Sequence, residues 1–96
     1  MPIVAVFESP SLTQARYEES VRKLTGGGRL QSPADWPVEG LLAHAAGQSK
    51  SGFRVVDVWE SEEAFRRFGE VLMPILQSLG VEGEPDIYQT HTFVCA

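Results

Sequence analysis

Two histidines and one aspartate are the side chains of this sequence best suited to move a proton near neutral pH. His44 and His91 are its only histidines, and Asp57 lies within an apolar run, two positions before Trp59. An imidazole changes its charge near neutral pH, and burial or a neighbouring carboxylate shifts that titration. Acid–base chemistry in a partly enclosed apolar site is therefore the first chemistry that these residues suggest.

Alternation along the strands predicts which of these side chains lie together. Val55, Asp57 and Trp59 share one face of their strand, because successive side chains point to opposite sides. A hairpin through 48–51 that sets His44 opposite Val55 puts the imidazole on the same face, whereas a shift of one residue would turn it away. On the last strand the same alternation groups Ile87, Gln89, His91, Phe93 and Cys95.

Other interpretations of these residues stay open. A lone histidine or aspartate in a sheet is commonly a hydrogen-bonded structural group, and a tryptophan such as Trp59 commonly packs in a core or an interface. His44, His91 and Asp57 also offer three metal donors, but their spacing matches no metal-site signature, so we predict no metal. Nucleotide-binding and esterase motifs are absent, and the glycines at 26–28 follow a helix rather than open one.

The composition is that of one small globular domain, which we assign to residues 1–96. Of its residues 43% are hydrophobic and 22% charged, and eight basic residues against thirteen acidic ones give a net charge of -5. This charge disfavours nucleic acid and anionic membranes as partners. Cys95 is the one cysteine, which excludes an intrachain disulfide. The sequence shows neither a basic leader nor a long apolar run, so we expect a cytoplasmic protein.

The first half of the chain predicts a strand, a helix and a long loop. Residues 2–8 are apolar and β-branched, as in a strand that is buried on both faces. Ser11 and Gln14 resemble a capping box, and apolar residues then recur at helical spacing up to a run of glycines. The loop 26–39 contains Trp36, which either pins the loop to its own domain, caps a pocket or reaches a neighbouring subunit.

The second half predicts a hairpin, a helix and a final strand. The runs 40–47 and 53–60 form the two strands of the hairpin. A helix then extends from the N-cap Ser61 to Gly80, with a broad apolar stripe. The alternating segment 86–95 is the last strand.

This order of elements predicts an α+β fold of the ferredoxin-like βαββαβ type, a four-stranded antiparallel sheet with two helices on one face. Its other face is bare, and so small a chain would cover it by self-association. We expect Val56 and Val58 to face the helices. We expect Val55, Asp57 and Trp59 to line a cavity at the second face, shared with another subunit.

The RNA-recognition domain has the same order of elements and places basic and aromatic residues on its third strand. Gly52, Phe53 and Val56 fit that pattern. Val55 and Val58 stand where it has aromatic rings, and each lost stacking ring removes about 1–3 kcal/mol per base. We therefore expect no nucleic acid partner.

The second hairpin and the helix after it carry a family resemblance. The stretch GLLAHAAG at 40–47 leads to GFRVVDVWESEEAFRRF at 52–68, where a strand ends in Trp-Glu-Ser and continues into an Ala-Phe-x-x-Phe helix. The chain resembles the dimeric α/β-barrel superfamily, and within it the antibiotic-biosynthesis-monooxygenase-like family. The resemblance implies a homodimer in which two sheets pack face to face into a barrel. It also implies a cleft between the sheet and the helices of each subunit.

Members of this family differ in activity. They include cofactor-independent oxygenases of polyketide aromatics, haem-degrading enzymes, isomerases and cyclases, besides many without a known activity. The haem-degrading members use an asparagine on the first strand and a tryptophan and a histidine in the second helix. This sequence contains no asparagine, and Phe68 stands near the place of that tryptophan, so haem degradation is not expected.

For this chain the resemblance implies a monooxygenase-like enzyme that needs no cofactor and acts on a small aromatic or polyketide-type substrate. Such an enzyme needs a dry pocket and a base, because the ionised substrate itself reacts with oxygen. His44 or His91 would be the base, and Asp57 would orient it. The substrate ring would be bounded by Trp59, Phe7 and Phe93. A cyclase or isomerase would use the same set, and the alternative is a non-catalytic ligand-binding or structural homodimer.

Overall fold

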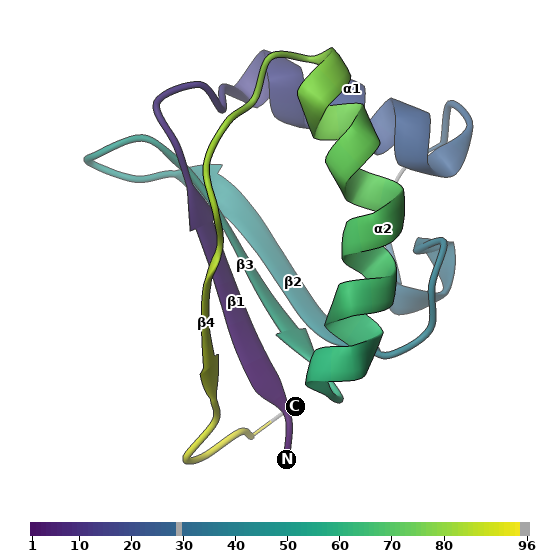
Figure 1. The fold of residues 1–96 in the computed structure, drawn as a ribbon, viewed down its shortest axis with the longest axis vertical. Helices are drawn as coiled ribbons and strands as arrows, with labels where there is room; N and C mark the ends of the chain where they lie inside the picture. Colours follow the sequence, from purple (N-terminus) through teal and green to yellow (C-terminus); the bar gives the residue numbers. More distant parts are fainter. Residues whose placement is uncertain (29, 95–96) are drawn as a thin grey trace.

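The computed structural model describes residues 1–28 and 30–94. In chain order its elements are β1 (Ile3–Glu8), α1 (Gln14–Thr25), the short 3-10 helix η1 (Pro33–Asp35), β2 (Leu41–Gln48), β3 (Phe53–Trp59), α2 (Glu62–Ser78) and β4 (Asp86–Gln89). The strands form an antiparallel sheet in the order β2-β3-β1-β4, and both helices lie over one face of it (Figure 1). This is the ferredoxin-like arrangement that the sequence predicts.

Helix α1 begins later than the sequence suggests. Its N-cap is Thr13, whose side chain accepts a hydrogen bond from a backbone N–H of the first turn at 3.2 Å. The predicted capping box at Ser11 is wrong, because the hydroxyl of Ser11 accepts instead from the backbone N–H of Glu82 at 2.7 Å. That bond ties the approach to α1 to the segment before β4. The helix ends as expected at Gly26, whose φ of 68° lies in the left-handed region that favours glycine.

Helix α2 begins where the sequence predicts. Ser61 is its N-cap and accepts a hydrogen bond from the N–H of Ala64 at 3.1 Å. The residues of α2 that are buried against the rest of the molecule are Ala64, Phe68 and Leu76. Within the described part of the chain, no helix is long and apolar enough to cross a membrane.

The register of the hairpin differs from the predicted one by two residues. His44 lies opposite Asp57 and not opposite Val55. The turn is tighter than expected, because the N–H of Ser49 donates to the carbonyl of Gly52 at 2.8 Å and the strands pair further toward the loop. A shift of two positions preserves the alternation, so His44 stays on the face of Asp57, as predicted. The imidazole and the carboxylate thereby become a directly opposed cross-strand pair.

The two faces of the sheet are exchanged relative to the prediction. Asp57 and Trp59 point toward the helices, and Trp59 is fully buried against Phe65 and Phe68 of α2. The opposite face carries short branched side chains that no helix covers, and we call it the valine face: Val4, Val6, Val56 and Val58. Both sides of β3 are apolar, so alternation alone does not tell which side is covered. Side-chain size does, because rings span the space between a sheet and helices, whereas valines form a flat surface.

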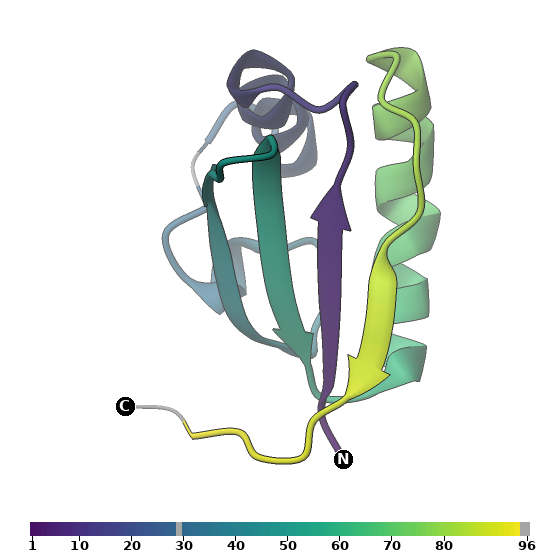
Figure 2. The ribbon, with the colours of Figure 1, turned by 90° about the vertical axis from the view of Figure 1, so that its left-hand side faces the viewer.

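Strand β4 ends at Gln89, and the prediction of a strand up to residue 95 is wrong. Gln89 lies opposite Ile3 of β1, and the next N–H, that of Thr90, donates to the carbonyl of Pro2 at 3.0 Å. Strand β1 begins at Ile3, so its pairing with β4 stops at Gln89. Figure 2 shows the chain leaving the sheet after β4. Cys95 lies outside the described residues.

Candidate functional site

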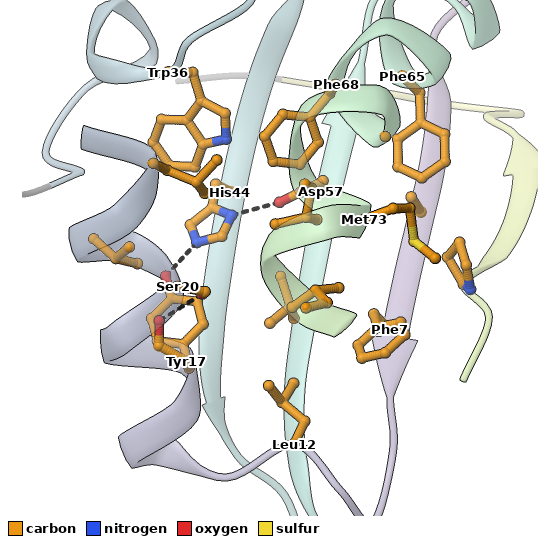
Figure 3. A pocket seen from close by; sticks show the side chains of 18 of the residues that line it. Phe7, Leu12, Tyr17, Ser20, Trp36, His44, Asp57, Phe65, Phe68 and Met73 are labelled. Atoms are coloured by element: carbon orange, nitrogen blue, oxygen red, sulfur yellow. Dashed lines mark hydrogen bonds and ion pairs between the residues drawn. The ribbon is translucent and has the colours of Figure 1, made fainter. Parts of the chain in front are cut away.

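A pocket of about 300 Å³ lies between the sheet and the helices (Figure 3). Strands β1 to β3, both helices and the loop between α1 and β2 contribute to its wall. Most of the wall is apolar, and its aromatic members other than His44 are Phe7, Tyr17, Trp36, Phe65 and Phe68. A largely apolar pocket with a few convergent polar groups is typical of a small-molecule site.

Three polar side chains from three elements form a hydrogen-bonded chain in this wall, which we call the relay (Figure 3). The hydroxyl of Tyr17, on α1, lies 2.6 Å from Nε2 of His44, on β2. Nδ1 of His44 lies 2.5 Å from Oδ1 of Asp57, on β3. The pairing of β2 with β3 positions His44 against Asp57, and α1 places the hydroxyl of Tyr17 against His44.

The donors and acceptors of the relay follow for an ionised Asp57 and a neutral His44. The side chains of His44 and Asp57 are only 16% and 8% exposed. An ionised carboxylate can only accept, so Nδ1 carries the imidazole proton and Nε2 accepts from the hydroxyl of Tyr17. Burial, and secondly the negative charge of Asp57, raises the pKa of Tyr17 above its ordinary value of 10.0. Tyr17 is therefore a protonated donor at neutral pH.

Aromatic contacts hold the relay in place. The Trp36 ring meets the His44 ring edge-on, with 4.7 Å between the centroids. The Tyr17 ring lies nearly parallel to that of His44 at 6.0 Å and packs on Phe53 at 5.2 Å. Trp36 is 8% exposed and belongs to the core as well as to the pocket wall. It therefore pins its loop and borders the pocket, which combines two of the roles considered for it.

Of the predicted site residues, the structure brings His44, Asp57 and Phe7 to the pocket. Trp59 is 0% exposed and is not part of the pocket wall. Its ring centroid lies 4.9 Å from that of Phe68, and its Nε1 has no hydrogen-bond partner among the residues that the structure describes. The structure therefore places Trp59 in the core behind the site.

The structure does not bring His91 and Phe93 to the other predicted residues. Both follow β4, where His91 is exposed and Phe93 is half-buried, and neither borders the pocket. The expected proximity of His91 to His44 and Asp57 is therefore not found. Among residues 1–28 and 30–94, no three histidine, cysteine, aspartate or glutamate side chains converge on a point that could hold a metal ion.

Sequence reasoning missed Tyr17, the outer member of the relay. A signal for it exists in the helical spacing, because Val21 and Leu24 follow it by four and seven positions and border the same pocket. A tyrosine on the apolar stripe of a helix carries a hydroxyl that needs a polar partner in the interior. His44 is that partner.

No family model matches the sequence, and no curated protein matches it significantly. Among solved structures the chain is similar to a protein from Shewanella loihica PV-4, provisionally described as a monooxygenase, with 20% identity, a TM-score of 0.55 and 96% of each chain covered. It is also similar to a monooxygenase from the gene ActVA-Orf6 of Streptomyces coelicolor in complex with nanaomycin D, with 23% identity and a TM-score of 0.49, covering 99% of this chain and 90% of that one. The first likeness shows that the chain shares the fold of the Shewanella protein over nearly its whole length.

Proposed function

We propose that the protein is a cofactor-independent, monooxygenase-like enzyme that acts on a small aromatic or polyketide-type substrate, with His44 as its acid–base group. The observation that carries the proposal is the relay in the wall of an otherwise apolar pocket of about 300 Å³. Ionisation of a phenol requires a proton acceptor, and the relay provides one in the wall of the pocket. The fold shared with a protein described as a monooxygenase agrees with this class of reaction.

The reaction is one in which the substrate supplies the electrons. A hydroxyl on the aromatic ring gives its proton to the relay, and the electron-rich phenolate then transfers electrons from its para carbon to O₂. A carbon–oxygen bond forms at that carbon, the O–O bond breaks, and loss of water leaves a carbonyl. One oxygen atom enters the product and the other leaves as water, while the ring loses two hydrogen atoms and becomes a quinone.

Asp57 and the pocket wall have supporting roles in this proposal. Asp57 is a positioning residue, because it holds the His44 tautomer and balances the positive charge that the imidazole gains. Phe7, Phe65 and Phe68 hold the ring of the substrate and keep water away. His91, Phe93 and Trp59 lie outside the pocket wall and have no part in the mechanism proposed here.

The alternative function is binding of a small ligand without turnover. The open pocket favours this alternative over a purely structural role, which predicts an interior filled by side chains. We keep it as an outcome of the experiment below.

We further propose that the protein acts as a cytoplasmic homodimer joined through the valine face. The four valines of that face are apolar and no helix covers them, which leaves room for a second sheet to pack against them. The pocket opens on the other side of the sheet, so each subunit would retain a complete relay.

Oxygen uptake with naphthalene-1,5-diol tests the proposed reaction. This probe has a ring hydroxyl and an unsubstituted para carbon, and the expected product is 5-hydroxy-1,4-naphthoquinone with one O₂ consumed per quinone formed. We expect saturable uptake by the wild-type protein, loss of it in His44→Gln, and retention in His91→Gln, since His91 lies outside the pocket. Binding of the probe without uptake would establish the alternative, and equal rates in wild type and His44→Gln would remove His44 from the mechanism.

A further inference from the structure

The polar atoms that border the pocket belong to few side chains. Ser20 donates its hydroxyl to the backbone carbonyl of Tyr17 at 2.7 Å. Arg66 pairs with Glu62 at 3.4 Å, and its side chain is 73% exposed. Figure 3 shows the relay on one side of the pocket and Phe65, among other apolar side chains, on the opposite side. A ligand in the pocket would therefore have the relay on its polar side and apolar side chains on the opposite side.

Within the relay, the hydroxyl oxygen of Tyr17 is the more accessible atom with acceptor capacity to spare, because the side chain of Asp57, whose Oδ2 also has free lone pairs, is only 8% exposed, whereas Tyr17 is half-buried. Both ring nitrogens of His44 are engaged, Nδ1 with Asp57 and Nε2 with Tyr17. A tyrosine hydroxyl has one donor and two acceptor lone pairs, and the contact with Nε2 uses the donor. A ligand in the pocket can therefore donate a hydrogen bond to the hydroxyl oxygen of Tyr17, whereas the lone pair of Nε2 of His44 already accepts from Tyr17.

We propose that the hydroxyl oxygen of Tyr17 is the atom that touches the ligand, and that it selects aromatic hydroxyl compounds over their methyl ethers. The proposal rests on the proposed function, which it deepens by naming the contact atom and the ligand group. An ether oxygen has no proton to donate, so in the pocket it meets an acceptor that it cannot pair with.

Proton transfer through Tyr17 balances without leaving a tyrosinate. The ligand hydroxyl gives its proton to the oxygen of Tyr17 while Tyr17 gives its own proton to Nε2 of His44. The ligand then carries the negative charge and His44 the positive one, beside the carboxylate of Asp57. Tyr17 now donates to the ligand oxygen, so the same hydroxyl stabilises the phenolate that it helped to form.

Two features of Tyr17 suit it to this role. Its ring packs on Phe53 and lies parallel to the imidazole of His44, which fixes the direction of the hydroxyl. Burial and the charge of Asp57 also raise its pKa, which disfavours a lasting tyrosinate and favours passage of the proton to His44. Tyr17 is thus a catalytic residue in this proposal, and His44 is the proton acceptor behind it.

Anaerobic binding measurements test the contact without any turnover. Calorimetry would compare naphthalene-1,5-diol with 1,5-dimethoxynaphthalene on the wild type, on Tyr17→Phe and on Tyr88→Phe. Tyr88 is the other tyrosine of the sequence, 51% exposed on β4, and serves as the matched control for loss of a hydroxyl. We expect the wild type and Tyr88→Phe to prefer the diol about tenfold, and Tyr17→Phe to lose that preference. A preference that survives in Tyr17→Phe, with circular dichroism unchanged, would overturn the proposal.

The aerobic assay separates this proposal from the proposed function. If Tyr17→Phe abolishes the preference for the diol but the wild type consumes no oxygen, the contact stands and the oxygenase function fails. If the wild type consumes oxygen and Tyr17→Phe does so at the same rate, the function stands and Tyr17 is not the contact. A loss of both preference and rate in Tyr17→Phe alone supports the two together.

Discussion

The two faces of the sheet differ in chemistry, although alternate residues of the same strands build them. The face under the helices carries His44, Asp57 and ring side chains, and it borders the pocket. The opposite face carries the short branched side chains of the valine face at its centre, and Asp86 and Tyr88 of β4 lie on it beside Val6 and Val4. The two faces differ in side-chain size, because the space between the helices and the sheet is deep enough for aromatic rings and for a ligand.

This difference suggests that the two faces have separable tasks. Substitutions under the helices should alter ligand chemistry and leave the association state unchanged. Substitutions on the valine face should do the reverse. The following predictions test that separation.

Asp57→Asn should have the largest effect. The amide has the shape of the carboxylate but lacks the charge that balances a protonated His44, and it no longer enforces one tautomer. We expect kcat for naphthalene-1,5-diol oxidation to fall about 10³-fold with little change in KM. Asp86→Asn, on exposed β4, is the control. A change in KM alone would show that Asp57 serves ligand binding rather than the proton.

Val56→Asp should break the proposed dimer. A carboxylate in the middle of an apolar contact would be desolvated without a partner, which costs about 3 kcal/mol or more. Sedimentation should give a dimer for the wild type and a monomer for Val56→Asp, while diol binding persists. Val71→Asp, at a position 40% exposed on α2, should stay dimeric. A monomeric wild type would refute the proposed interface.

Substitutions of the two tryptophans test which side chains under the helices belong to the core and which belong to the site. Trp59→Phe should lower the free energy of unfolding by about 2 kcal/mol, since it leaves a cavity in the core, and should keep the affinity for the diol. Trp36→Phe should weaken diol binding, because Trp36 borders the pocket and contacts His44. Urea unfolding and calorimetry on both variants measure these effects. Equal losses of affinity would place Trp59 in the site after all.

The smallest effect should appear in the alkaline stability. The pKa of Tyr17 is raised in the folded protein, so above about pH 10 the unfolded chain binds fewer protons than the folded one. The free energy of unfolding therefore falls as the pH rises through this window, and the contribution is fully present below it. Tyr17→Phe should show a shallower fall than the wild type, measured by urea unfolding at stepped pH. A parallel fall in both proteins would show that Tyr17 does not titrate in this way.

The order of the elements and the partnership of His44 with Asp57 followed from the sequence, because glycines, caps and alternation are local signals. The exact register, the choice of face and the end of β4 did not. Each depends on something distant: the turn at Ser49, the size of the rings under α2, and the point where β1 begins. Helical spacing places Tyr17 on the apolar stripe of α1, but its contact with His44 depends on the packing of α1 over β2, which the spacing does not encode.

The oxidation rate of the Tyr17→Phe and His44→Gln double variant tests the central claim most directly. Groups that pass one proton along a chain act as a unit, so removing either should cost nearly as much as removing both. We predict that kcat for naphthalene-1,5-diol falls to about the same level in the two single variants and in the double variant. Losses that multiply in the double variant would show two independent groups and would contradict the relay.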